Sequence, residues 1–288
     1  MWIRRIARHL FILLLTVLLG GFLGATLVRL APGFDVDEQE LDARLSEESL
    51  QAIRKSRHAE NNVLRFYGRY LAGLSQGDLG VSRSLRRPVA QLLAERISST
   101  VKFVAIGLVV GWVLGLGLAL PAAMSRGWGY DLFSTLFSGI FFCLPSGVLA
   151  FLFLFIGGPG PLAIGFVVFP KIFRYARNVL LQTYGLPHVL TAQAKGLGRT
   201  RILLWHVFPS AAPQILALAG VSVSVAIGAA IPIEVICGSA GIGQLAWQAA
   251  LGRDLPLLVN LTLLVTVATL LANTASDLAI ATSARHQQ

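Results

Sequence analysis

The sequence predicts an all-α integral membrane protein with six transmembrane helices. Of its 288 residues, 55% are hydrophobic and only 13% are charged, and the mean hydropathy is +0.70. A soluble domain carries about 25% charged residues, so this chain lacks the polar surface that water requires. Several apolar segments also approach the roughly 20 residues that a helix needs to cross the hydrocarbon core of a bilayer. These observations place the chain in a membrane.

The net charge of +10 does not indicate a nucleic-acid partner, because the basic residues lie mainly at the ends of apolar segments. Basic residues at such positions set the orientation of a membrane protein. Cys143 and Cys237 lie far apart, so they predict neither a disulfide framework nor a metal site. The five histidines are scattered without a metal-chelating spacing.

The N-terminal residues 1–30 predict the first transmembrane helix, with its N-terminus in the cytoplasm. Basic residues 2–9 precede the almost wholly apolar residues 10–28. The alternative is a cleaved secretory signal, which has the same order of basic and apolar segments. The apolar run is longer than is usual for a signal, and no small-x-small cleavage site precedes Arg29. A retained helix is therefore the preferred interpretation.

Residues 31–98 differ in kind from the rest of the chain, because they hold ten acidic and ten basic residues. Such a balanced segment predicts a large, mostly helical external loop between the first and second helices. Its arginines do not argue against an external position, since loops longer than about 60 residues escape the positive-inside rule.

Residues 99–288 predict a core of five helices. The expected spans are 99–122, 132–156, 162–181, 213–231 and 257–280, with 232–256 as an external, re-entrant-like stretch. The fourth span carries Lys171, Arg174 and Arg177, which we expect to snorkel at its cytoplasmic end. A re-entrant or interfacial segment is the alternative there. Placing both termini and 182–212 in the cytoplasm puts the basic, acid-poor segments inside.

Three glycines recur every fourth residue in the second predicted span: Gly107, Gly111 and Gly115. This spacing places small side chains on one helix face, which suits close helix packing in a membrane. The alternative is that glycine is simply common in membrane helices.

The sequence gives little support for an enzymatic function. No Asp or Glu occurs between Leu132 and Ile233, so that stretch has no carboxylate pair for acid–base chemistry. No phosphate-binding G-x-x-x-x-G-K-[ST] motif occurs either. The ionisable residues Lys102, Glu234 and Asp277 lie near predicted span ends, where we interpret them as interfacial anchors. The glycine cluster at 238–243 predicts a turn. We therefore expect a non-catalytic chain without a cofactor or metal.

The segment 186–212 predicts a compact, protruding elbow on the cytoplasmic side. A short alanine-rich helix is broken by Gly196-x-Gly198, and an amphipathic helix resumes over 202–208 and reaches Pro209. Small residues on such an elbow allow another protein surface to approach closely. From the residues alone, a docking surface and an ordinary loop are both open.

Four ordered motifs resemble one family. Ala192-x-Ala194-Lys195-Gly196-Leu197, followed by Pro209, resembles the EAA loop of ABC importer permeases in the dipeptide/oligopeptide/nickel branch. Further stretches are similar to that branch in the same order: 64–74 with 77–82 and 87–89, then 234–256, then Asn273 and Asp277. Leu190 and Gln193 stand where the family has a glutamate and an arginine.

The resemblance implies a permease subunit of an ATP-driven importer of peptide-like or nickel-like solutes in a bacterial cytoplasmic (inner) membrane. It implies a second permease subunit as heterodimer partner, two ATPase subunits at the elbow, an external solute-binding protein, and lipid. The residues that it implies for ATPase coupling are Thr191, Ala192, Ala194, Lys195, Gly196, Leu197 and Pro209. Those that it implies for the external-loop motif are Gly77, Asp78, Gly80 and Ser82. The glycines near Asp78 predict a tight turn in which its side chain caps nearby backbone amides.

Two other classes compete with this interpretation. A stand-alone transporter or channel, driven by no ATPase, would be indicated by charges at the membrane midplane or by an inverted repeat. An intramembrane enzyme would be indicated by a convergent nucleophile–base pair. The sequence provides evidence for neither.

Overall fold

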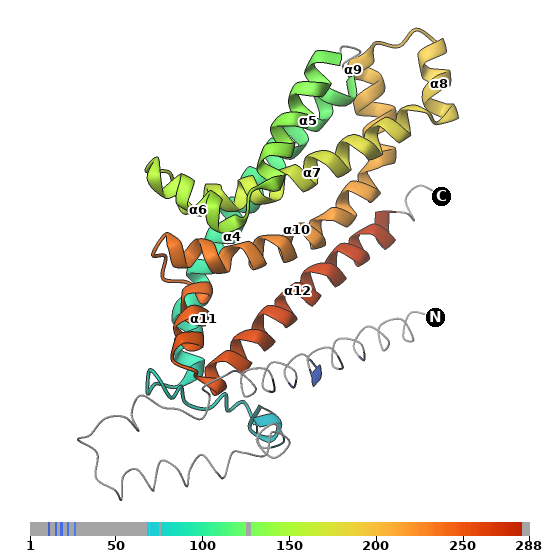
Figure 1. Cartoon of the computed structure of the whole chain (residues 1–288). Coiled ribbons are helices and arrows are strands. Elements are labelled where there is room, and N and C mark those ends of the chain that lie inside the picture. Colours follow the sequence, from blue (N-terminus) through green and yellow to red (C-terminus); the bar gives the residue numbers. More distant parts are fainter. Residues whose placement is uncertain are drawn as a thin grey trace, which may run out of the picture. The chain divides into compact units, whose positions relative to one another are not determined.

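The computed structural model describes residues 11, 15, 18, 19, 22, 26, 68, 70–74, 76–124 and 128–283 (Figure 1). The predicted first helix over 1–30 lies almost entirely outside the described residues, as does the part of the predicted external loop 31–98 that precedes residue 68. Regular structure in the described part is helical, apart from one isolated antiparallel bridge between Val81 and Pro88.

The helices in chain order are α4 (Val89–Met124), α5 (Trp128–Cys143), α6 (Ser146–Phe155), α7 (Gly160–Tyr184), α8 (Pro187–Ala194), α9 (Arg199–Ile202), a π-helical turn (Leu203–Val207), α10 (Phe208–Ile236), α11 (Ile242–Leu251) and α12 (Leu255–Ser283). In the described part, three segments are long and apolar enough to cross a membrane: Val89–Met124, Arg199–Ile236 and Leu255–Leu278. A fourth is added if the bent pair α5–α6 crosses as one unit. The all-α membrane architecture is confirmed, while the count of six helices stays a prediction.

The chain divides into two compact units, which we consider separately. One lies within Met1–Arg96 and Leu245–Val267, and we call it the Asp254 unit; the other lies within Ile97–Gln244 and Ala268–Gln288, and we call it the α7 unit. In the α7 unit, α7 contacts α5, α6 and α10 (Figure 1). Its side chains Ile164, Val168 and Ile172 are fully buried in the core.

The glycines of α4 give the closest helix contact in the α7 unit. A Cβ atom added at Gly107 or Gly115 would lie 2.6 Å from a side-chain carbon of Ile164 or Ile172, respectively. Gly111, between them, is also in tight contact with α7. Since real Cβ atoms do not approach other atoms this closely, the prediction of close packing through these glycines is confirmed.

The predicted span 132–156 is not one helix. α5 ends at Cys143 and α6 begins at Ser146, and the two are bent by 101°. The break follows from Pro145, which has no amide hydrogen and whose ring disfavours the helical conformation of the residue before it. Pro145 itself is extended, with φ −59° and ψ 147°. The interpretation as one continuous helix was therefore wrong.

We expected the basic residues of α7 to lie at its cytoplasmic end, but they do not all lie at a helix end. Lys171 lies eleven residues after Gly160 and thirteen before Tyr184, close to the middle of the helix. Arg177 instead forms a two-point ion pair with Asp131 of α5, with Nε–Oδ1 at 2.7 Å and Nη2–Oδ2 at 2.6 Å. The snorkelling of these side chains stays a prediction, while Arg177 has a carboxylate partner that the sequence alone did not indicate.

α4 begins at Val89, ten residues before the predicted start of the second span at 99. A helix can begin in a loop and continue into a span, so the loop boundary at residue 98 stays a prediction. The predicted re-entrant-like stretch 232–256 contains the end of α10, the short helix α11 and the start of α12.

The α4–α7 contact makes a specific prediction about stability. Gly107→Ala places a methyl group against Ile164, so we expect the free energy of unfolding to fall by about 1–3 kcal/mol, as for an overpacked core. Gly117→Ala is the matched control on the same helix, because a Cβ atom there meets nothing within 4 Å. Gly117→Ala should leave the free energy of unfolding unchanged or raise it by up to about 1 kcal/mol, because alanine has the higher helix propensity. Thermal melting of the purified variants in detergent measures both. Equal melting temperatures would show that α4 and α7 are not in close contact.

Candidate functional site

The elbow over 186–212 has the predicted order of elements. α7 ends at Tyr184, and α8 begins three residues later with Pro187 at its first position, where the missing amide hydrogen is not needed. α8 ends at Ala194, and after a short turn α9 and the π-helical turn lead into α10 without a break. The elbow therefore joins the ends of two long helices.

Gly196 forms the turn after α8 through its backbone conformation. Its φ is +76°, in the left-handed region that glycine adopts without penalty. The amide of Gly196 donates to the carbonyl of Gln193 at 2.9 Å, and that of Leu197 donates to the carbonyl of Ala192 at 3.4 Å. These two bonds are a Schellman motif. Because a Cβ atom there meets nothing within 4 Å in this chain, positive φ rather than crowding requires glycine.

The inner face of α8 packs on the elbow itself. Val189 is fully buried and Ala192 is 4% exposed, and both join a cluster with Ile202, Leu203 and Val207. The resemblance implies a coupling role for Ala192, but its side chain faces the elbow rather than an outer surface. Its small side chain instead lets α8 lie close to the helix that leads into α10.

The outer face of α8 is exposed and carries no charge before Lys195. Leu190, at the position of the family's glutamate, is 51% exposed, and Thr191, Ala194 and Lys195 are exposed beside it. Pro209 is exposed at the start of α10. Of the predicted coupling residues, those of the outer face could meet another protein.

Sequence reasoning missed a polar contact that joins α8 to α10. The Ser210 hydroxyl donates to the His206 carbonyl at 3.0 Å and lies 3.2 Å from Nε2 of His188. A π-helical turn shifts the backbone hydrogen-bond ladder by one residue, so carbonyl groups near it accept bonds from side chains. Spacing alone does not reveal this turn.

The external-loop motif forms a turn, as predicted. Gly77 and Gly80 have φ of +78° and +75°. Between them, Oδ1 of Asp78 accepts a hydrogen bond from the Gly80 amide at 2.8 Å, which is the capping role that we expected.

Ser82, the last residue of this motif, is buried against the carboxylate of Asp254, which lies in the stretch 234–256 that resembles the family. Its hydroxyl donates to Oδ2 of Asp254 at 2.5 Å. Ser84 donates to the same oxygen from its amide at 3.0 Å and from its hydroxyl at 2.9 Å. Asp254 is fully buried, and its other oxygen accepts from the Leu257 amide at 3.2 Å. Asp254 is thus the N-cap of α12 and holds the loop motif to that helix.

Asn260 adds a second link between the loop and α12 in the Asp254 unit. Its amide group donates to the carbonyl of Leu79 at 3.0 Å, and its oxygen accepts from the Tyr70 hydroxyl at 2.8 Å. Asp254 could have been found from sequence, since an aspartate two residues before a proline at a helix start is a helix N-terminus signal. Asn260 had no such signal.

We interpreted Glu234 as an interfacial anchor, and this interpretation was wrong. Glu234 is fully buried near the end of α10 and accepts from the Thr100 hydroxyl and from the Gly243 amide, each at 2.7 Å. The Thr100 hydroxyl also accepts from the Ile242 amide. At Gly241 a Cβ atom would overlap the carboxylate. The glycine cluster is therefore a turn, as predicted, that makes room for a buried carboxylate at the start of α11.

Among the described residues, no three His, Cys, Asp or Glu side chains gather in a way that could hold a metal ion. The polar groups described above bind backbone amides and hydroxyls, so they stabilise turns and helix ends.

The helical architecture and the elbow define a membrane permease, and comparison with known proteins identifies its class. Residues 107–286 match the family "Binding-protein-dependent transport system inner membrane component". The chain belongs to this family. It is thus the permease component of an ABC importer, and the prediction of this class over a stand-alone transporter is confirmed.

Individual relatives agree with the family. The chain is 29% identical over 262 residues to the oligopeptide transport system permease protein OppB of Escherichia coli K12, covering 83% of this chain and 84% of the relative. It is 29% identical over 276 residues to OppB of Haemophilus influenzae, covering 88% of each. Among solved structures, an inward-facing conformation of the MetNI methionine ABC transporter shares the fold, with a TM-score of 0.60 at 19% identity over 67% of this chain and 96% of that chain.

The Asp254 contacts predict different effects of substitutions at Asp254 and Asp78. Asp254→Ala leaves the buried Ser82 hydroxyl without its acceptor and removes the N-cap of α12. We therefore expect the free energy of unfolding to fall by about 2–3 kcal/mol. Asp78→Ala removes one exposed hydrogen bond, so we expect a loss of about 1 kcal/mol or less. Melting temperatures of the two purified variants test this order. Equal shifts would mean that Asp254 does not hold the loop to α12.

Proposed function

We propose that this permease imports peptides, forming half of a translocation path whose opening is driven by separate ATPases. The observation that carries the proposal is the elbow, whose outer face is exposed and whose ends continue into α7 and α10. The peptide class is supported by the OppB relatives, whose names state oligopeptide transport. The nickel-like alternative has no comparable support.

The partners in this proposal are a second, different permease subunit, two ATPase subunits and an external solute-binding protein. Each ATPase docks at the elbow of one permease. Closure of the ATPases moves the elbows together and shifts the population from one access state to the other, as a rigid-body transition. The bond cleavage of ATP hydrolysis belongs to the ATPases, and this chain supplies the path and the lever.

The orientation that we propose places both termini and the elbow in the cytoplasm of a bacterial cell, and the loop 31–98 outside the inner membrane. The support is the acid-free stretch between Leu132 and Ile233, which contains Lys195, Arg199 and Arg201 in the elbow. Six crossings then consist of the N-terminal helix, α4, the α5–α6 pair, α7, α10 and α12.

Reconstituted uptake tests this function. The complete transporter in proteoliposomes should take up a labelled oligopeptide only with ATP and the binding protein, and should not take up Ni²⁺. The purified permease chain alone should hydrolyse no ATP, because it has no phosphate-binding loop. Uptake of Ni²⁺ without peptide uptake, or ATP turnover by this chain alone, would contradict the proposal.

The elbow gives the sharpest mechanical prediction. Gly196→Asp places a side chain at a φ of +76° and at the edge of the proposed docking face, so the chain should insert normally but lose ATP-coupled uptake. Lys195→Ala changes an exposed neighbour in a right-handed conformation and should retain most of the uptake.

Two measurements at matched membrane levels separate the causes: pull-down of the ATPase and ATP-driven uptake. Asparagine tolerates left-handed conformations better than most residues. Gly196→Asn should therefore retain more function than Gly196→Val if backbone strain is the cause. Full ATPase retention and full uptake in Gly196→Asp would remove the elbow from the mechanism.

A further inference from the structure

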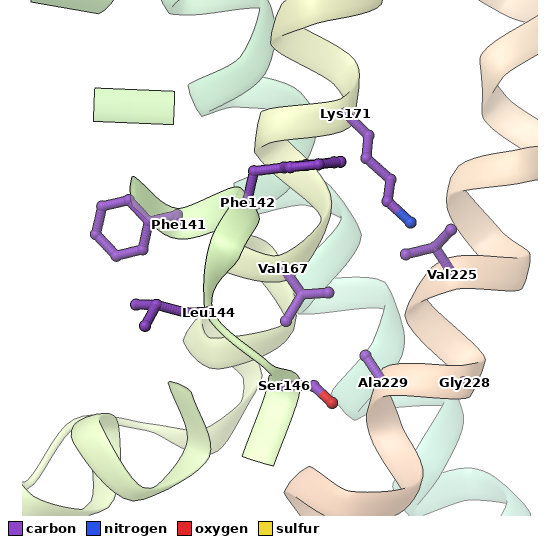
Figure 2. Close-up of a pocket in the computed structure, with 9 residues that line it drawn as sticks. All are labelled: Phe141, Phe142, Leu144, Ser146, Val167, Lys171, Val225, Gly228 and Ala229. Carbon is purple, nitrogen blue, oxygen red and sulfur yellow. The ribbon is translucent and has the colours of Figure 1, made fainter. Parts of the chain in front are cut away.

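A pocket of about 350 Å³ opens in the α7 unit where α5 breaks from α6. The break at Leu144 separates the end of α5 from the start of α6, and the pocket extends from there between α7 and α10 (Figure 2). Its volume is at the lower end of the range for small-molecule sites, about 300–1,000 Å³. The break between α5 and α6 thus lies at the wall of this pocket, since Leu144 and Ser146 line it.

Lys171 is the one charged residue of the pocket lining, which is otherwise mostly apolar. Figure 2 shows its ammonium group pointing across the pocket toward Val225 of α10. Gly228 belongs to the α10 wall, where a Cβ atom would meet nothing within 4 Å. Ser146 adds a hydroxyl at the start of α6. The pocket therefore offers one cation, one hydroxyl and apolar walls.

The charge of Lys171 is not balanced by a carboxylate in the described part of the chain. No Asp or Glu occurs from Leu132 to Ile233. Asp131, the acidic residue directly before this stretch, forms a two-point ion pair with Arg177. A second cation adds to the imbalance, because Arg174 lies one turn after Lys171 with its guanidinium 5.0 Å from the centroid of Phe142, a residue of the pocket.

Lys171 lies near the middle of α7, and its side chain is exposed at the open pocket. Eleven residues separate Lys171 from the first residue of α7 and thirteen from the last, which is about 16–20 Å at 1.5 Å per residue. In the proposed topology α7 is one of the six crossings, so Lys171 belongs to a membrane-spanning helix. Charges inside membrane segments are rare and mark the paths of substrates or ions. A structural role would call for a carboxylate partner, which the described residues do not provide.

We propose that the Lys171 pocket binds the carboxylate of a solute in transit, which for a peptide is its free C-terminal carboxylate. The ammonium group pairs with the carboxylate, and the apolar walls receive the side chain of the terminal residue. The positive field also excludes metal cations from the pocket. This inference rests on the proposed peptide function, and it adds the chemical group that the path recognises.

The test compares one peptide in two forms, with a free C-terminal carboxylate and with a C-terminal amide. Uptake is measured in proteoliposomes that contain the complete transporter, with binding protein in excess. Lys171→Gln should lower uptake of the free acid by about tenfold or more, because a hydrogen bond between two charged groups is lost. The same variant should leave uptake of the amide unchanged, and Lys171→Arg should retain most uptake of the free acid.

Lys102→Gln is the matched control, since Lys102 is an exposed lysine on α4 outside the pocket. It should leave uptake of both peptides unchanged, and co-purification of the ATPase confirms that each variant assembles. Equal uptake of the free acid by Lys171→Gln and wild type would overturn the pocket while the peptide function stands. An equal loss for both peptides, together with loss of a co-purifying anionic lipid, would assign the pocket to a lipid phosphate and also overturn it. If the wild-type transporter takes up no peptide at all, the proposed function itself fails.

Discussion

The close approach of α4 and α7 is the contact on which the rest of the α7 unit depends. In a bilayer, water does not drive helices together, so association relies on close packing and on hydrogen bonds. The glycines of α4 provide a groove in which Ile164 and Ile172 lie, with no room for a Cβ atom at Gly107 or Gly115. The helix held in this way borders the Lys171 pocket at its middle and leads directly into α8 at its end. One rigid element therefore joins the proposed solute contact to the proposed coupling surface, so a movement at the elbow has a direct mechanical route to the path.

Features that depend on one backbone position or on a short spacing could be predicted from the sequence. Gly196 between two helix-forming segments indicated a bend, and the structure forms it with a φ of +76°. Asp78 between two glycines indicated a tight turn capped by its own side chain, and that hydrogen bond is present. The four-residue spacing of the α4 glycines indicated one packed face. In each case the physical cause is local, so neighbouring residues contain the whole signal.

Features that depend on distant residues could not be predicted in this way. Glu234 looked like an interfacial anchor because its partner Thr100 lies 134 residues away in sequence. Ala192 looked like a contact residue because composition does not reveal which face of an eight-residue helix is buried. The span 132–156 was predicted from its apolar composition. That composition does not change at Pro145, although the helix is broken there. The pocket lined by Lys171 could not be predicted either, because its walls come from residues of α5, α6, α7 and α10 that are distant in sequence.

Cysteine accessibility along α8 in whole membranes tests the central claim, that the outer face of this helix is the surface on which the ATPase docks. Single cysteines at Thr191 and Ala194 should react with a reagent added from the cytoplasmic side when the ATPase is absent, and should be protected when it is present. Cysteines at Val189 and Ala192 should react poorly in both conditions, because these positions are buried within the chain. Reaction of the outer face from the external side only, or equal reaction of Thr191 and Ala194 with and without the ATPase, would contradict the account.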